Sequence, residues 1–119
     1  MNTKAENSDQ QKITTALIIL ASDIGSIYSI INASDTNSEI FTKSKILHEE
    51  ANTIGYNAEI GIFDLEKIKK MVAHLSNLAG TIYKKREINP LISDELISAL
   101  KKAMIDAENV LKLTTAISS

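Results

Sequence analysis

The strongest constraint on the fold is a regular spacing of small and apolar residues along most of the chain. From Ile40 to Ile82 the intervals between such residues alternate between four and three. These positions are Ile40, Ser44, Leu47, Ala51, Ile54, Ala58, Gly61, Leu65, Ile68, Val72, Leu75, Ala79 and Ile82. Heptad spacing of this kind is typical of helices that present one stripe to neighbouring helices. It predicts an all-α protein.

Two flanking segments carry the same spacing. Before the long stripe stand Ile13, Leu17, Leu20, Ile24, Ile27 and Ile31, and after it stand Ile97, Leu100, Met104, Ala107, Leu111 and Thr114. A chain of 119 residues with one proline and four glycines suits a single helical domain. We expect a polar, disordered N-terminal tail over residues 1–8 and one helical-bundle domain over residues 9–117.

Side chains that typically begin or end helices predict where the individual helices of this domain lie. Ser8 with Gln11, and Thr36 with Glu39, have the spacing of capping boxes, which predicts helix starts near residues 9 and 37. The polar residues 33–38 between the first two helices favour a loop. Pro90 predicts the end of a helix that runs to about residue 86. Ser93 is a suitable N-cap for the last helix.

The stretch HEEANTIGYNAEIGIFDLEK, residues 48–67, leaves two architectures open. In the first, the chain turns near Gly61 and Asp64 caps a new helix, which gives an antiparallel four-helix bundle. In the second, residues 38–86 form one long central helix, and a three-helix chain completes its bundle by dimerisation. Gly55 and Gly61 each cost about 1 kcal/mol inside a helix, so the turn is favoured.

The segment most similar to a membrane span covers residues 13–31. Its uninterrupted apolar part, residues 16–21, is much shorter than the roughly 20 residues that a spanning helix needs, and Asp23 follows directly. We therefore predict a buried amphipathic helix and no membrane insertion.

Composition and motifs favour no enzymatic chemistry. The chain has no cysteine, which excludes disulfides and thiolate metal sites and makes a cytoplasmic location the default. His48 and His74 lack the spacing of helical metal sites, and no activated serine or glycine-rich phosphate loop is present. A net charge of −2 and few aromatic residues disfavour nucleic acid. We expect a protein that is not an enzyme and binds no cofactor, metal or nucleic acid.

Charge is unevenly distributed although it nearly cancels. Residues 66–86 carry six basic side chains and one acidic side chain, Glu66, a local charge of +5. The basic residues are Lys67, Lys69, Lys70, Lys84, Lys85 and Arg86. This segment could form a basic docking face, although such lysines also commonly keep a bundle soluble.

One short segment resembles a known family. Asn52-Thr-Ile-Gly-Tyr-Asn-Ala-Glu-Ile60 is similar to Asn-Leu-Leu-Ala-Leu-Asn-Ala-Ala-Ile at the signalling tip of bacterial methyl-accepting chemoreceptors. The turn that follows, Gly61-Ile-Phe-Asp64, is shorter than the turn of the family and lacks its kinase-coupling residues. The resemblance implies a helical hairpin that dimerises and passes a signal through side-to-side contact.

These observations predict a non-enzymatic module for helical protein–protein interaction, with a chemoreceptor-like scaffold in bacterial signalling as one setting. A small immunity or inhibitor protein that neutralises a toxin or enzyme is the alternative. The expected partner is another helical protein. We also expect a homodimer, because serine and alanine leave little apolar bulk along the long stripe. The candidate partner-binding residues are Asn52, Tyr56, Asn57, Glu59, Lys67 and Lys70.

Overall fold

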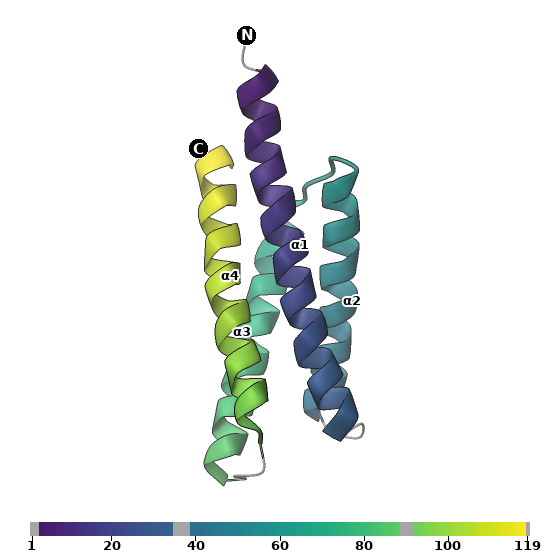
Figure 1. Cartoon of the computed structure of the whole chain (residues 1–119), viewed down its shortest axis with the longest axis vertical. Coiled ribbons are helices and arrows are strands. Elements are labelled where there is room, and N and C mark those ends of the chain that lie inside the picture. The colour runs from purple at the N-terminus through teal and green to yellow at the C-terminus, as the bar shows by residue number, and fades with distance from the viewer. Residues whose placement is uncertain (1–2, 35–38, 89–91, 119) are drawn as a thin grey trace.

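Four α-helices make up the fold, seen in a computed structural model that describes residues 3–34, 39–88 and 92–118. They are α1 (Thr3–Ser34), α2 (Glu39–Glu59), α3 (Leu65–Ile88) and α4 (Asp94–Ser118) (Figure 1). Each helix contacts the next along the chain, and α4 contacts α1, so the helices close a ring. The predicted antiparallel four-helix bundle is confirmed. The alternative with one long central helix is wrong.

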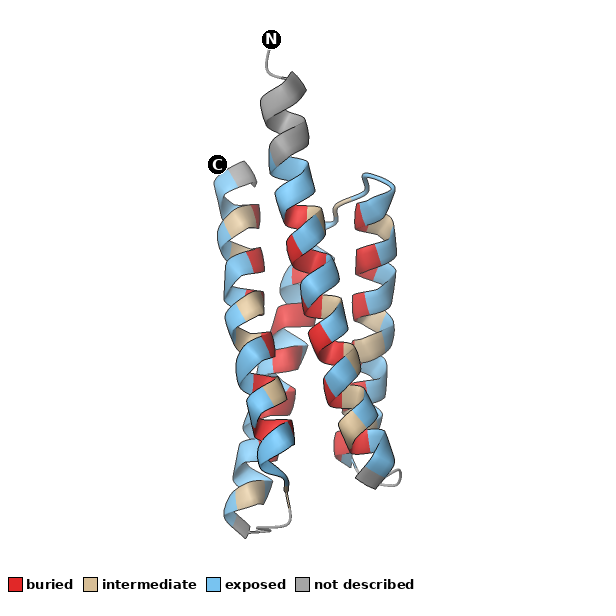
Figure 2. Ribbon diagram, in the orientation of Figure 1, coloured by how far each residue is buried: buried red, intermediate tan, exposed pale blue. Residues whose placement is uncertain are grey.

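The core lies along the axis of this ring. All six residues of the first predicted stripe, Ile13 to Ile31, are buried, as are most residues of the second. The buried positions face the interior of the bundle on every helix (Figure 2). The second stripe is interrupted at the turn, because Gly61 is exposed and Leu65 is only half-buried there. Regular spacing therefore continues across residues 58–65 although the helix does not.

The first helix begins earlier than the sequence predicts. The structure starts α1 at Thr3, so Ser8 lies within the helix and not at its start. Most of the segment expected to be a disordered tail therefore belongs to α1. Its N-terminal turns extend past the ends of the other helices (Figure 1). The second predicted capping residue, Thr36, and Pro90 lie outside the described residues.

A glycine turn separates α2 from α3. Gly61 has a φ of 84°, and Ile62 N donates to Asn57 O at 2.7 Å while Gly61 N donates to Ala58 O at 3.1 Å. These two hydrogen bonds form a Schellman motif, which satisfies carbonyls that the helix end leaves free. Asp64 then caps α3, since its Oδ1 accepts a hydrogen bond from Lys67 N at 3.2 Å. The predicted turn and cap are confirmed.

Alanine substitutions at two exposed glycines are expected to change the stability of the protein in opposite directions. Gly61→Ala should lower the free energy of unfolding by about 1 kcal/mol, because an L side chain is disfavoured at positive φ. Gly80→Ala should raise it by about 0.5–1 kcal/mol, since Gly80 is exposed inside α3 and an added Cβ meets no atom within 4 Å. Urea denaturation measures both. Equal effects of the two substitutions would contradict the assigned turn.

Among the described residues, one helix is long and apolar enough to cross a membrane. It is the stretch Asp9–Ala33 within α1, and 39% of its most apolar window is buried inside the bundle. The core helix of a soluble protein passes the same test. The predicted burial of the apolar stripe is confirmed, whereas the absence of membrane insertion stays a prediction.

Candidate interaction surface

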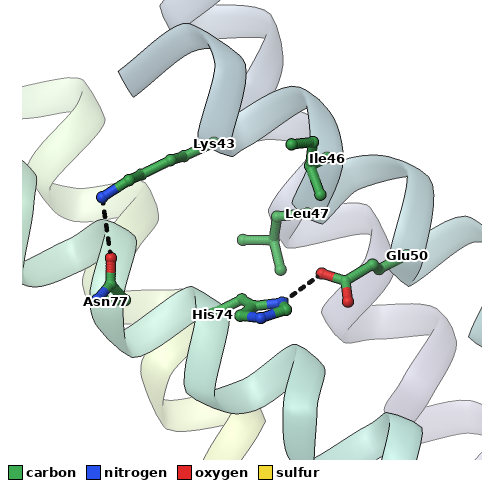
Figure 3. Close-up of a pocket in the computed structure, with 6 residues that line it drawn as sticks. All are labelled: Lys43, Ile46, Leu47, Glu50, His74 and Asn77. Carbon is green, nitrogen blue, oxygen red and sulfur yellow. Dashed lines mark hydrogen bonds and ion pairs between the residues drawn. The ribbon is translucent and has the colours of Figure 1, made fainter. Parts of the chain in front are cut away.

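A surface groove lies between α2 and α3, about halfway along the length of the bundle. Its lining includes Ile46 and Glu50 from α2 and His74 and Asn77 from α3, around a volume of about 210 Å³ (Figure 3). His74 Nδ1 lies 2.7 Å from Glu50 Oε1, and Lys43 Nζ donates to Asn77 Oδ1 at 3.1 Å. These cross-helix contacts show the level of α2 relative to α3.

The groove continues toward the α2–α3 turn. A neighbouring hollow of about 440 Å³ shares Ile46 and Glu50 and adds Glu49, Lys67 and Lys70. Because the two hollows have these residues in common, we treat them as one surface feature, the α2–α3 groove. Its walls carry both acidic and basic side chains, and its floor is apolar.

The outward side of α2 carries a second stripe with heptad spacing. Ile46, Glu49, Thr53, Tyr56 and Ile60 follow one another at intervals of three and four residues, and we name them the outer stripe. Its three large apolar side chains are well exposed: Ile46 by 52%, Tyr56 by 64% and Ile60 by 56%. Ile62, exposed by 53%, follows in the turn. Several exposed apolar side chains on one face of a small protein make that face a candidate interaction site.

Three of the six predicted partner-binding residues lie on this surface. Tyr56 belongs to the outer stripe, and Lys67 and Lys70 line the α2–α3 groove. Asn57 is half-buried, and its backbone oxygen accepts both Ile60 N and Ile62 N in the turn.

The other two predicted residues lie elsewhere on α2. Glu59 is exposed at the end of the helix. Asn52 Nδ2 lies 3.4 Å from His48 Nε2, and the His48 ring stacks on Tyr28 of α1. Asn52 therefore faces the junction with α1, away from the α2–α3 groove.

The predicted basic docking face is divided. Lys67 and Lys70 lie in the α2–α3 groove, whereas Lys84 and Lys85 are exposed near the other end of α3. The distance from Lys70 to Lys84 is about 21 Å along a helix. Arg86 pairs with Asp94 at the start of α4. Segment 66–86 therefore does not form one continuous basic surface.

Sequence reasoning missed several residues of this surface, chiefly Ile46, Glu49, Ile60 and the Glu50–His74 pair. The outer stripe was visible as a second set of heptad intervals within residues 46–60. It was overlooked because the inward stripe of the same helix is longer and more apolar. The pairing of Glu50 with His74 depends on the level of two helices, which spacing along one helix does not reveal.

A charged cluster connects α1 with α4 on another side of the bundle. Asp23 is only 7% exposed, and its Oδ1 accepts a hydrogen bond from Lys102 Nζ at 2.7 Å. Lys102 Nζ also lies 3.0 Å from Asp106 Oδ2. The second oxygen of Asp23, Oδ2, is buried and has no hydrogen-bond partner within the described part of the chain. One carboxylate of this cluster is therefore poorly solvated.

The pKa of Asp23 is raised to about 6, chiefly by burial and next by a hydrogen bond with Asp106, while Lys102 opposes the shift. The same hydrogen bond lowers the pKa of Asp106. Two carboxylates form such a bond only when one of them holds the proton. The buried member, Asp23, keeps the proton. Hydrogen bonds to Asp23 and then to Asp106 raise the pKa of Lys102.

Over residues 3–34, 39–88 and 92–118, no group of three or more His, Asp or Glu side chains is placed to hold a metal ion. No protein-family model, no curated protein and no solved structure matches the chain. The resemblance of residues 52–60 to the chemoreceptor tip stays a prediction.

Proposed function

We propose that the protein is a non-enzymatic interaction module that binds an amphipathic helix of a partner protein on the α2–α3 groove and the outer stripe. The observation that carries the proposal is the exposure of three large apolar side chains at heptad spacing on one helix: Ile46, Tyr56 and Ile60. Heptad-spaced apolar residues are what a second helix contacts when two helices pack lengthwise.

The shape and chemistry of the surface support a helical partner. The outer stripe runs about 21 Å from Ile46 to Ile60, the length of about four helical turns. Beside it, the α2–α3 groove offers acidic and basic walls that would select the register of a bound helix. The resemblance of residues 52–60 to a chemoreceptor tip suggests signalling through contact between helical hairpins as the setting.

Replacing apolar residues of the outer stripe should abolish partner binding without unfolding the bundle. We expect Ile46→Ser and Tyr56→Ser together to reduce recovery of the partner from host extract at least about tenfold, since buried apolar anchors dominate such interfaces. Affinity purification followed by mass spectrometry measures recovery, and circular dichroism checks helicity.

Ile105→Ser is the matched control. Ile105 is exposed by 66% on α4, more than Ile46 on α2, so its replacement removes at least as much exposed isoleucine surface from another face. Unchanged recovery with the outer-stripe variant, or equal loss with the control, would contradict the proposal.

A further inference from the structure

We propose that a second copy of this chain occupies the α2–α3 face, and that the two copies are related by a two-fold axis parallel to the bundle. The inference rests on the proposed function, because it names a partner for the same surface. In this arrangement α2 of each copy packs against α3 of the other. The α2 and α3 helices of the two copies then form a further four-helix arrangement at the interface.

The level of the helices determines which residues would meet. Lys43 lies level with Asn77, and Glu50 with His74, as their contacts of 3.1 and 2.7 Å show. A two-fold axis parallel to the helices exchanges the two copies and preserves the level of every residue. Ile46 of one copy would therefore lie against the part of α3 between residues 74 and 77 in the other copy.

Charge is complementary in this arrangement. Glu49 stands exposed on the outer stripe, and Lys67 and Lys70 stand exposed on α3 beside the same hollow. Within the described residues, none of these three side chains has an ion-pair partner. The two-fold axis places Glu49 of each copy opposite the basic wall of the other, so every such contact occurs twice. A two-fold axis perpendicular to the helices would instead bring α2 against α2, acid against acid.

The steric fit and the available area agree with a dimer of moderate affinity. Ala73, exposed on α3 within about one turn of the level of Ile46, is small and leaves room for side chains between the helices. The bundle is 21 Å wide, and α2 with its 21 residues is about 31 Å long, so the face covers about 650 Å² per copy. Standard-size interfaces bury about 800 Å² per partner, and weaker ones less.

The arrangement can be tested with two charge-reversal variants, first separately and then mixed. Sedimentation equilibrium up to hundreds of micromolar should give wild-type protein twice the chain mass of 13.0 kDa. Glu49→Lys alone and Lys70→Glu alone should each weaken dimerisation at least about tenfold, because like charges then meet twice. An equimolar mixture should dimerise again, since the lysine introduced at position 49 of one chain meets the glutamate introduced at position 70 of the other. A contact within one chain could not produce this rescue.

Lys101→Glu, an exposed reversal on α4, is the control and should dimerise like wild type. A monomeric wild-type protein at hundreds of micromolar would overturn the dimer but not the proposed function, because loss of a host partner from the outer-stripe variant is measured independently. Two outcomes would overturn the α2-against-α3 arrangement. In the first, both single variants dimerise as tightly as wild type. In the second, the mixture dimerises no more tightly than either variant alone.

Cysteine cross-linking provides a geometric test, and the chain contains no native cysteine. Chains with Ile46→Cys mixed with chains with Asn77→Cys should form a disulfide-linked dimer under mild oxidation. Ile46→Cys alone should cross-link poorly. Efficient cross-linking of Ile46→Cys with itself would show α2 packed against α2 and would overturn the inference.

Discussion

Leu20→Ala is expected to lower the free energy of unfolding by about 2–5 kcal/mol, the largest effect on stability that we predict. Leu20 is fully buried in the middle of α1, the helix that packs most closely on two neighbours, α2 and α4. The helices therefore have little freedom to close around the cavity. Urea denaturation followed by circular dichroism measures the loss.

Ile105→Ala is the control for this substitution. Ile105 is 66% exposed, so we expect a change within about 0.5 kcal/mol. If Leu20→Ala lowered the free energy of unfolding no more than Ile105→Ala, then Leu20 would not lie in the core and the assigned inward face of α1 would be wrong.

Asp23→Asn is expected to stabilise the protein near pH 8 by about 1–2 kcal/mol and to remove a specific pH dependence. The folded state raises the pKa of Asp23 from 3.8 to about 6, chiefly through burial. Between about pH 4 and pH 6 the folded chain therefore binds more protons at this residue than the unfolded chain. Stability must then fall as the pH rises through this window and stay low above it.

The measurement is the difference in the free energy of unfolding between wild type and Asp23→Asn at each pH. Titrating groups that both proteins share contribute equally to the two values and cancel in this difference. Urea denaturation near pH 4 and near pH 8 should show wild type losing stability relative to Asp23→Asn. The lowered pKa of Asp106 acts in the opposite direction, but only as the pH falls below about 4. Parallel curves for the two proteins would contradict the assignment of a buried, proton-retaining carboxyl group.

Lys102 provides a second check on the same cluster. Lys102→Met removes the ammonium that opposes the raised pKa of Asp23, so the fall in stability should shift to higher pH. Lys101→Met, at the neighbouring exposed position, should leave it unchanged.

Much of the fold could be predicted because local and periodic signals agreed. The inward stripe from Ile13 to Ile31, the N-caps at Asp64 and Ser93 and the turn at Gly61 all depend on chemistry within a few residues. The start of α1 was placed too late, because Ser8 and Gln11 have the spacing of a capping box although the helix begins at Thr3. Polar residues at the end of a helix carry no apolar stripe from which its extent could be predicted.

The candidate site was only partly predictable, for a different reason. Tyr56, Lys67 and Lys70 were identified from the segment in which they lie, yet Asn52 faces α1 and the basic segment is divided. Which residues meet across α2 and α3 depends on how far the helices slide past each other and on their rotation. Both are set by the packing of the whole core.

The cluster around Asp23 shows the same limit. Asp23 was noted only as a polar interruption of an apolar segment, because its partner Lys102 lies 79 residues further along the chain. The pairing exists only because the bundle brings α1 against α4. No spacing within either helix indicates it.

Photo-cross-linking in the native host tests the central claim most directly. A photoreactive amino acid is placed at residue 46 on α2 or at residue 105 on α4, both normally exposed isoleucines. The proposed interaction surface predicts a covalent adduct from position 46 and little from position 105. An adduct of twice the chain mass would identify a second copy, and any other mass a different partner. Equal adduct yields from both positions, or adducts from position 105 alone, would contradict the placement of the partner on the α2–α3 face.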